Sequence, residues 1–257
     1  MKLLSCILIA LAIVDVYGDE PDKLVNGIPT TIQEYPHCVS LRQGNSHFCG
    51  GSIIGDRFIV TAAHCVESLI RSPLQRAAVT VVTGTTYLNS GGQSYRLENV
   101  WRHESYNPNH PAGRGPYDIG LIKLSSPIQY GSTVQKVNLP TRAAAANEAV
   151  TIAAWGSTGF RQGIHNNLQK LHAKIMLPNT CAAYHRNLMP VDQTEICTLI
   201  SMGTGLCNGD SGSGLIRDSD RTIIGLVSGG KPCAQGVPDV YTNVFSHLSW
   251  IQQKMRQ

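Results

Sequence analysis

Residues 209–212 read Gly209-Asp210-Ser211-Gly212 and place a serine between an acidic residue and a glycine. Two earlier segments carry related polar groups, namely Thr61-Ala62-Ala63-His64-Cys65 and Asp118-Ile119-Gly120-Leu121-Ile122-Lys123-Leu124. Each segment alone is a weak signal, because a histidine beside a cysteine is usually structural and an acidic residue before a turn is common. Together they supply histidine, aspartate and serine in that chain order, the groups that a serine nucleophile needs as base and orienting carboxylate.

The rest of the chain predicts an all-β fold. Short β-branched runs recur between glycine, proline and serine breaks, at residues 52–54, 58–61, 79–83, 119–124, 223–227 and 240–244. Many short strands with turn signals predict a sandwich or barrel, and no alternation of strands with helices indicates a parallel sheet. Apolar residues at i, i+3 and i+7 predict one terminal helix, with Ser246 as its cap; they are Leu248, Ile251 and Met255.

The composition excludes several classes of protein. Among 257 residues, 42% are hydrophobic and 15% are charged, which argues against a disordered chain. The 25 glycines and 13 prolines show no three-residue period, so a collagen helix is excluded. The net charge of +4 comes from scattered basic residues. We therefore expect no nucleic-acid partner and no membrane partner.

The N-terminus has the organisation of a secretory signal peptide. Lys2 supplies the positive charge, residues 3–14 are nearly all apolar, and the residues before Gly18 suit signal cleavage, so residues 1–18 are expected to be removed. The apolar run is shorter than the roughly 20 residues that a membrane helix needs. We expect a secreted, extracellular protein, in which most of the seven remaining cysteines pair and one is left over.

With these segments, the chain resembles the trypsin/chymotrypsin family of secreted serine endopeptidases over essentially all of residues 24–257, and insect chymotrypsins most of all. Ser211 is not at the centre of a Gly-x-Ser-x-Gly segment, which argues against the α/β-hydrolase type. The resemblance implies two packed six-stranded antiparallel β-barrels with a C-terminal helix and an active site between the barrels. A change of composition at residues 139–147 indicates a linker, with the boundary between the two halves near residues 140–148.

The resemblance also implies the catalytic roles. Ser211 would attack the scissile carbonyl, His64 would act as base and then as acid, and Asp118 would orient the imidazole. The backbone N–H groups of Gly209 and Ser211 would form the oxyanion hole.

Activation by cleavage is implied in the same way. Residues 19–23 would form a propeptide that a trypsin-like protease removes after Lys23. The new ammonium group of Leu24 would then pair with Asp210, whose burial alone would be costly. Leu24 departs from the isoleucine that is usual in the family.

By resemblance, the cysteines pair as Cys49–Cys65, Cys181–Cys197 and Cys207–Cys233. Cys38 is left over and is expected to be a buried small hydrophobe rather than a reactive thiol. Thr85 and residues 91–93 stand where calcium-binding relatives carry acids, so we expect no metal, and no cofactor is expected. His172 and His185 are expected at the surface.

The residues of the P1 (S1) pocket leave its specificity open. Gly205 stands six residues before the nucleophile, where trypsins carry an aspartate, and Gly230 matches a glycine that admits large side chains. Ser228 borders this pocket and matches the serine that supports the buried aspartate. Asp239 stands where the family commonly has glycine, and could either meet a basic P1 group or hydrogen-bond away from the slot. We expect chymotrypsin-like cleavage after large apolar residues, with broad collagenolytic-type specificity as the alternative.

Two departures put catalytic efficiency in doubt. Ser213-Gly214 stands where most relatives have Gly-Pro, and Gly229 replaces an aromatic residue that floors the subsites before the scissile bond. A non-catalytic homologue that acts as a binding protein is therefore a second, less favoured hypothesis. The partners expected for the enzyme are peptide and protein substrates, the activating protease and protein inhibitors, and the enzyme is expected to be a monomer.

Overall fold

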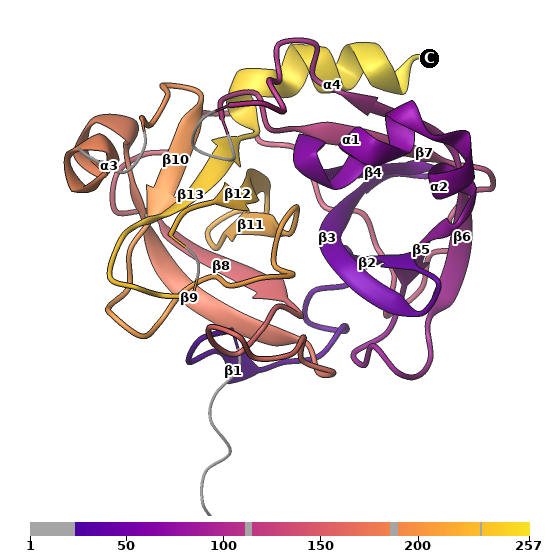
Figure 1. Ribbon diagram of the computed structural model, residues 1–257, viewed down its shortest axis with the longest axis horizontal. Coiled ribbons are helices and arrows are strands. Elements are labelled where there is room, and N and C mark those ends of the chain that lie inside the picture. Colours follow the sequence, from indigo (N-terminus) through magenta and orange to yellow (C-terminus); the bar gives the residue numbers. More distant parts are fainter. Residues whose placement is uncertain (1–23, 111–114, 186–189, 232) are drawn as a thin grey trace, which may run out of the picture.

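The computed structural model describes residues 24–110, 115–185, 190–231 and 233–257, so the expected signal peptide and propeptide lie outside the described residues. Two barrels lie side by side, with the N-terminal half of the chain in one and the C-terminal half in the other (Figure 1). None of the helices among the described residues has both the length and the apolar character to cross a membrane.

The first barrel is a closed antiparallel ring of six strands. The strands are β2 (Cys38–Gln43), β3 (Ser46–Gly55), β4 (Phe58–Thr61), β5 (Val79–Thr83), β6 (Gln93–Arg102) and β7 (Gly120–Leu124). They pair in the order β2-β3-β4-β7-β6-β5. Alternate side chains point inward because successive residues of a strand face opposite sides. Val39, Leu41 and Val81 thereby meet Ile53 and Ile59 in one apolar core.

The second barrel closes in the same way. Its strands are β8 (Ala149–Ala154), β9 (Gln169–Met176), β10 (Glu195–Thr198), β11 (Gly214–Arg217), β12 (Ile223–Gly229) and β13 (Asp239–Asn243). The order β9-β10-β13-β12-β11-β8 is closed by pairing of β8 with β9, and the short β1 (Ile28–Pro29) adds to the free side of β9. The two six-stranded barrels implied by the resemblance are confirmed.

The helices were only partly predictable. The sequence indicated the terminal helix α4 (Leu248–Met255), but Ser246 is not its cap: it lies in a 3₁₀ turn, Phe245–His247, which runs directly into the helix. The short helices α1 (Ala63–Arg71), α2 (Pro73–Ala77) and α3 (Pro178–Tyr184) were not predicted. Both α2 and α3 begin with proline, which is favoured at the first helical position and could have indicated them.

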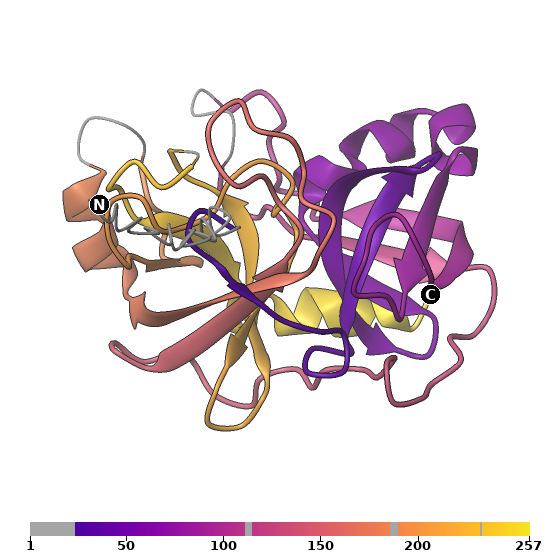
Figure 2. The same ribbon diagram turned by 90° about the horizontal axis from the view of Figure 1, so that it is seen from below.

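One apolar cluster joins the two barrels. Ile54 and Leu121 of the first barrel pack with Ile223 and Leu226 of the second, and α4 adds Ile251. Figure 2 shows α4 running from the second barrel toward the first. Asp118 lies two residues before β7, so this junction fixes where that aspartate lies.

The three disulfides implied by the resemblance are present, Cys49–Cys65, Cys181–Cys197 and Cys207–Cys233. Cys38 is free and buried, and burial raises the pKa of its thiol to about 12, as expected for an unreactive cysteine. The surface placement expected for His185 is wrong. His185 caps the C-terminal end of α3 and is fully buried, and its Nε2 donates a hydrogen bond to the carbonyl oxygen of Pro238 at 3.0 Å.

The core of the first barrel yields a stability prediction. Ile53 is 0% exposed, so we expect Ile53→Ala to lower the free energy of unfolding by about 2–5 kcal/mol through lost burial and a residual cavity. Ile28→Ala is the matched control, because Ile28 is 51% exposed and should cost less than about 0.5 kcal/mol. Urea denaturation of both variants checks this, and equal losses would contradict the packing described for Ile53.

Candidate active site

Strand pairing brings His64 and Asp118 together. Thr61 at the end of β4 pairs with Gly120 at the start of β7, so His64 in α1 follows one strand where Asp118 precedes the other. The Asp118 carboxylate accepts from both nitrogens that His64 presents, with His64 Nδ1 at 2.8 Å from Oδ2 and the backbone nitrogen at 2.9 Å from Oδ1. The histidine and aspartate of the sequence prediction thus form one hydrogen-bonded unit.

The second barrel holds the same aspartate. Ser228 Oγ of β12 donates to Asp118 Oδ2 at 2.7 Å, and Thr242 Oγ1 of β13 donates to the Asp118 carbonyl oxygen at 2.8 Å. Burial would raise the pKa of Asp118, but the charge of His64 and the donated hydrogen bonds outweigh it, and the pKa is lowered. The carboxylate is therefore ionised at neutral pH.

Asp118 in turn sets the proton chemistry of His64. Burial lowers the pKa of His64, but the charge of Asp118 and its hydrogen bond outweigh burial, so the pKa lies above its ordinary value. Because Nδ1 donates to the carboxylate, the neutral imidazole keeps Nε2 as its acceptor. A basic nitrogen with that fixed tautomer is suited to take a proton from a hydroxyl group.

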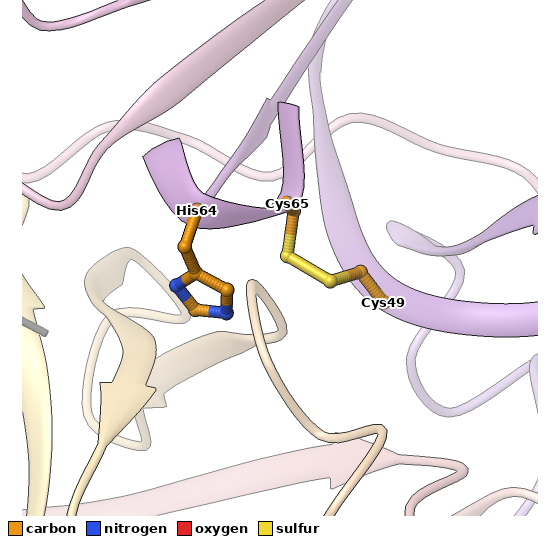
Figure 3. A group of neighbouring side chains, drawn as sticks. All are labelled: Cys49, His64 and Cys65. Carbon is orange, nitrogen blue, oxygen red and sulfur yellow. A yellow bond between two sulfur atoms is a disulfide. The ribbon is translucent and has the colours of Figure 1, made fainter. Parts of the chain in front are cut away.

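The Cys49–Cys65 disulfide lies beside His64 (Figure 3). The ligand atoms of these three residues lie within 4.8 Å of one another, a spacing that could hold a metal ion. The two sulfurs are bonded to each other, however, and a metal binds thiolates rather than disulfide sulfur. The group is therefore a clamp that ties α1 to β3, and it does not fit a metal centre.

Ser211 lies on a segment that packs against the histidine loop. The Ser211 carbonyl oxygen accepts from Gly50 N at 2.8 Å. A Cβ atom on Gly212 would lie 2.1 Å from Thr61 Oγ1, and the residue has φ +78°, so only glycine fits. Thr61 stands three residues before His64. The contact between Gly212 and Thr61 therefore brings the Ser211 segment close to the His64 segment.

Two peptide groups beside Ser211 are held by their carbonyl oxygens. Asn208 O accepts from Ser157 N at 2.7 Å, and Asp210 O accepts from Ser213 N at 3.1 Å. In a trans peptide the C=O and N–H groups point in opposite directions. The N–H groups of Gly209 and Ser211 therefore point away from these partners, which is the direction that an oxyanion hole at this position requires.

His47 supports this arrangement and was not identified from the sequence. Its Nε2 lies 3.0 Å from Gly209 O, and its Nδ1 lies 2.8 Å from Ser40 Oγ. A carbonyl oxygen can only accept, so Nε2 donates and Nδ1 accepts, which is the neutral form. Burial lowers the pKa of His47 to about 4, in agreement with that form. The contact joins residues 162 positions apart, so no local motif could have indicated it.

Asp210 is buried with backbone donors. Gly156 N and Cys207 N each donate to its carboxylate at 2.8 Å, and a Cβ on Gly156 would lie 2.2 Å from the nearer oxygen. Burial raises the pKa of Asp210 to about 8, with the backbone hydrogen bonds opposing and Asp239 adding to the rise. Leu24 is fully buried in the second barrel, but its ammonium exists only after cleavage at Lys23, so the ion pair stays a prediction.

A cavity of about 180 Å³ opens beside Ser211 and Gly209, and two residues of the predicted pocket, Gly230 and Asp239, line it. The two remaining pocket predictions lie differently. Gly205 lies beneath Asp239, and the hydroxyl group of Ser228 is directed to Asp118 instead of the cavity.

The Asp239 carboxylate occupies the floor of this cavity. Its Oδ2 accepts from Leu206 N at 3.0 Å, and a Cβ on Gly205 would lie only 2.7 Å from that oxygen. Asp239 thus fills the space that a side chain at position 205 would take. Burial raises the pKa of Asp239 to about 7, against the opposing hydrogen bond from Leu206. The sequence did not determine which way Asp239 points; in the structure Asp239 lines the slot.

Comparisons with known proteins agree with this geometry. The family model described as "Trypsin" matches residues 24–251. Chymotrypsin-2 of Vespa crabro is 38% identical over 231 residues, which are 90% of this chain and 99% of that protein. Trypsin beta of Drosophila erecta is 36% identical over 233 residues, 89% of this chain and 87% of that protein. The solved structure of neuropsin, a serine protease expressed in mouse brain, has a TM-score of 0.79 at 28% identity, covering 89% of this chain and 98% of that one.

The buried acid on the cavity floor predicts a pH-dependent stability. From about pH 5 to about pH 7, an unfolded chain has its aspartates ionised, whereas folded Asp239 retains a proton. Its contribution therefore makes the free energy of unfolding fall as the pH rises toward 7, and Asp239→Asn should make that fall less steep. Urea titrations at a series of pH values measure the slope.

Asp220→Asn is the matched control. The pKa of Asp220 is lowered, against the effect of burial, by hydrogen bonds from Thr222 and Arg217, so this group is ionised in both states over the same range. Its slope should equal that of the parent. An unchanged slope in Asp239→Asn would mean that the buried carboxyl is already ionised in the folded protein.

Proposed function

Because the chain belongs to the trypsin family of serine proteases, we propose that it is a secreted endopeptidase, made as a zymogen, that cleaves peptide bonds through an acyl-enzyme on Ser211. The observation that carries the proposal is the hydrogen-bonded unit of Ser228, Asp118 and His64, packed beside the Ser211 segment with its two N–H groups.

The residues divide the reaction between them. Ser211 Oγ attacks the scissile carbonyl carbon while His64 Nε2 takes the hydroxyl proton, and Asp118 stabilises the imidazolium that forms. The carbonyl oxygen becomes an oxyanion that the N–H groups of Gly209 and Ser211 stabilise. Collapse breaks the C–N bond as His64 returns its proton to the leaving amine. Water, deprotonated by the same histidine, then hydrolyses the ester and restores Ser211.

Activation follows from the burial of Asp210. The bond after Lys23 suits a trypsin-like activating protease, and its cleavage would create an ammonium group on Leu24. Burial raises the pKa of the Asp210 carboxyl group to about 8. The positive charge of a cation brought into contact with it would lower that pKa and favour the ionised form. We propose that the ammonium of Leu24 is this cation, and that the pairing stabilises the segment from Cys207 to Ser211.

The pocket floor favours mixed P1 specificity. Gly230 leaves the mouth of the slot open, and Asp239 fills the space next to Gly205 and places one titratable acid in the slot. A neutral Asp239 suits large apolar or aromatic P1 groups, whereas an ionised Asp239 suits lysine or arginine. The relatives include a protein named as a chymotrypsin and proteins named as trypsins, which is consistent with a scaffold that supports either preference. Strict chymotrypsin-like specificity is the alternative.

The catalytic proposal is tested on protein cleaved after Lys23. A serine-directed phosphonate should label the parent chain at one site, and Ser211→Ala should abolish labelling and lower kcat at least about a thousandfold. Ser125→Ala, an exposed serine after β7, should behave as the parent. No labelling of protein with a confirmed new N-terminus at Leu24 would instead favour the non-catalytic binding homologue.

The specificity proposal is tested with peptides that differ only at P1, carrying Phe, Tyr, Leu, Lys or Arg. Asp239 is protonated below its pKa of about 7 and anionic above it, so the ratio of kcat/KM for Arg over Leu should rise about tenfold between pH 6 and pH 8.5. Titration of His64 affects both peptides and cancels in the ratio. Asp239→Asn should remove the rise. A constant ratio with strong aromatic preference would establish strict chymotrypsin-like specificity.

A further inference from the structure

A second and larger cavity lies on the other side of Gly209 from the P1 pocket. It measures about 670 Å³, within the roughly 300–1,000 Å³ of small-ligand sites. The hairpin of β2 and β3 lines it with Arg42 and His47, and a loop of the second barrel adds Ile164. Gly209 forms its boundary with the active site, because its carbonyl oxygen accepts from His47 and a Cβ on it would lie 2.4 Å from Ile164 Cδ1.

Arg42 is a buried cation that lines this cavity, and no described acidic residue forms an ion pair with it. It is 8% exposed, its Nε donates to Ser40 Oγ at 3.0 Å, and its Nη2 is buried without a hydrogen-bond partner among the described residues. None of the residues that line the cavity is acidic. Buried charges are normally paired. The guanidinium therefore keeps a donor that the described part of the protein does not satisfy, in a residue that lines the cavity.

Arg217 shows how the same fold treats a buried arginine that has a structural role. It is 1% exposed and forms ion pairs with Glu148 and Asp220, and its guanidinium also donates to the carbonyl oxygens of Arg142 and Ala143. Arg42 has one hydroxyl partner instead of this set. The contrast distinguishes a guanidinium that is satisfied within the protein from one that is not.

We propose that this cavity is a subsite for a carboxylate carried by the leaving-group half of the substrate, with the Arg42 guanidinium as its ligand. The inference rests on the proposed endopeptidase function. Arginine suits this role because its planar fork binds a carboxylate through two parallel hydrogen bonds. His47 is neutral and the other lining residues are uncharged, so Arg42 alone determines the sign of the site.

The position of the cavity selects the leaving-group half. In the proposed function, a P1 side chain in the pocket would lie against Val227 and Gly230. The residues before the scissile bond would then continue on that side of Gly209. The peptide beyond the bond must leave on the other side, toward the cavity. From Gly209 to Arg42 the bonds through His47 and Ser40 span on the order of 10 Å, or about three extended residues at roughly 3.4 Å each. The carboxylate should therefore come from the second or third residue after the cleaved bond.

The test uses matched peptides with one P1 residue and either Glu or Gln at the second and third positions after the scissile bond. In protein cleaved after Lys23, we expect kcat/KM to favour the Glu peptide about tenfold, and rising NaCl to reduce this preference. Arg42→Gln should make kcat/KM equal for the two peptides, and a cooperative urea unfolding transition shows that the variant is folded. Arg42→Lys should retain part of the preference.

Arg256→Gln is the charge-matched control, because Arg256 is exposed at the C-terminal end of α4 and does not line the cavity. The preference of this variant for the Glu peptide should equal that of the parent. Sodium acetate at matched ionic strength distinguishes the source of the carboxylate. If the site takes a substrate carboxylate, acetate should lower kcat/KM for the Glu peptide and leave kcat/KM for the Gln peptide unchanged. If acetate also changes turnover of the Gln peptide, the cavity is a site for free carboxylates and the proposal is overturned. Equal rates for both peptides in the parent, or a preference that survives Arg42→Gln, would also overturn it.

A binding measurement separates this proposal from the proposed function. Ser211→Ala cannot form an acyl-enzyme, so calorimetry with the intact peptides reports recognition alone. Tighter binding of the Glu peptide that disappears in the Ser211→Ala, Arg42→Gln double variant supports the carboxylate subsite even if the parent proves inactive. Equal binding of both peptides to a chain that does hydrolyse them rejects the subsite and leaves the endopeptidase function standing.

Discussion

Asp118 is a fully buried carboxylate that both barrels hold at once. The first barrel contributes two donors through His64, and the second contributes Ser228 to the carboxylate and Thr242 to the backbone. A buried charge is tolerated only when it is paired and hydrogen-bonded. The two barrels must therefore take the one relative position in which both supply these partners to Asp118. Burial of the apolar cluster between the barrels stabilises their contact. The hydrogen bonds of Asp118 determine how the two barrels are placed relative to each other in that contact.

Close backbone approach is the second constraint on the site. Gly212 lets the serine segment lie against Thr61, and Gly156 lets a backbone N–H reach Asp210. Side chains at either position would collide with groups that are themselves fixed. The peptide orientations on either side of Asp210 follow from these contacts. The directions of the Gly209 and Ser211 N–H groups, which the proposed function uses to bind an oxyanion, thus belong to a tightly packed segment before β11.

The sequence predicted those features that repeat or that form local patterns. Short alternating strands indicated the all-β fold, and the order of His64, Asp118 and Ser211 indicated the family resemblance. Contacts between distant residues could not be predicted in this way. His47 meets Gly209, and Asp239 covers Gly205, only because hairpins far apart in the chain close on one another. The burial of His185 and the 3₁₀ turn at Ser246 likewise depend on packing rather than on a local signal.

Three buried carboxylates near the site differ in what compensates them. Asp118 is paired with His64, which carries a positive charge when protonated, and the pKa of Asp118 is lowered. Within the described parts of the chain, Asp210 and Asp239 are paired with N–H donors alone, and burial raises their pKa values to about 8 and about 7. N–H dipoles alone do not offset burial of a charge as well as a full positive charge does. In the proposed function, the cations that Asp210 and Asp239 lack would arrive from outside, as the Leu24 ammonium and a basic P1 group. Because the charge of Asp239 disfavours ionisation of Asp210, a cation bound at either acid would ease ionisation of the other.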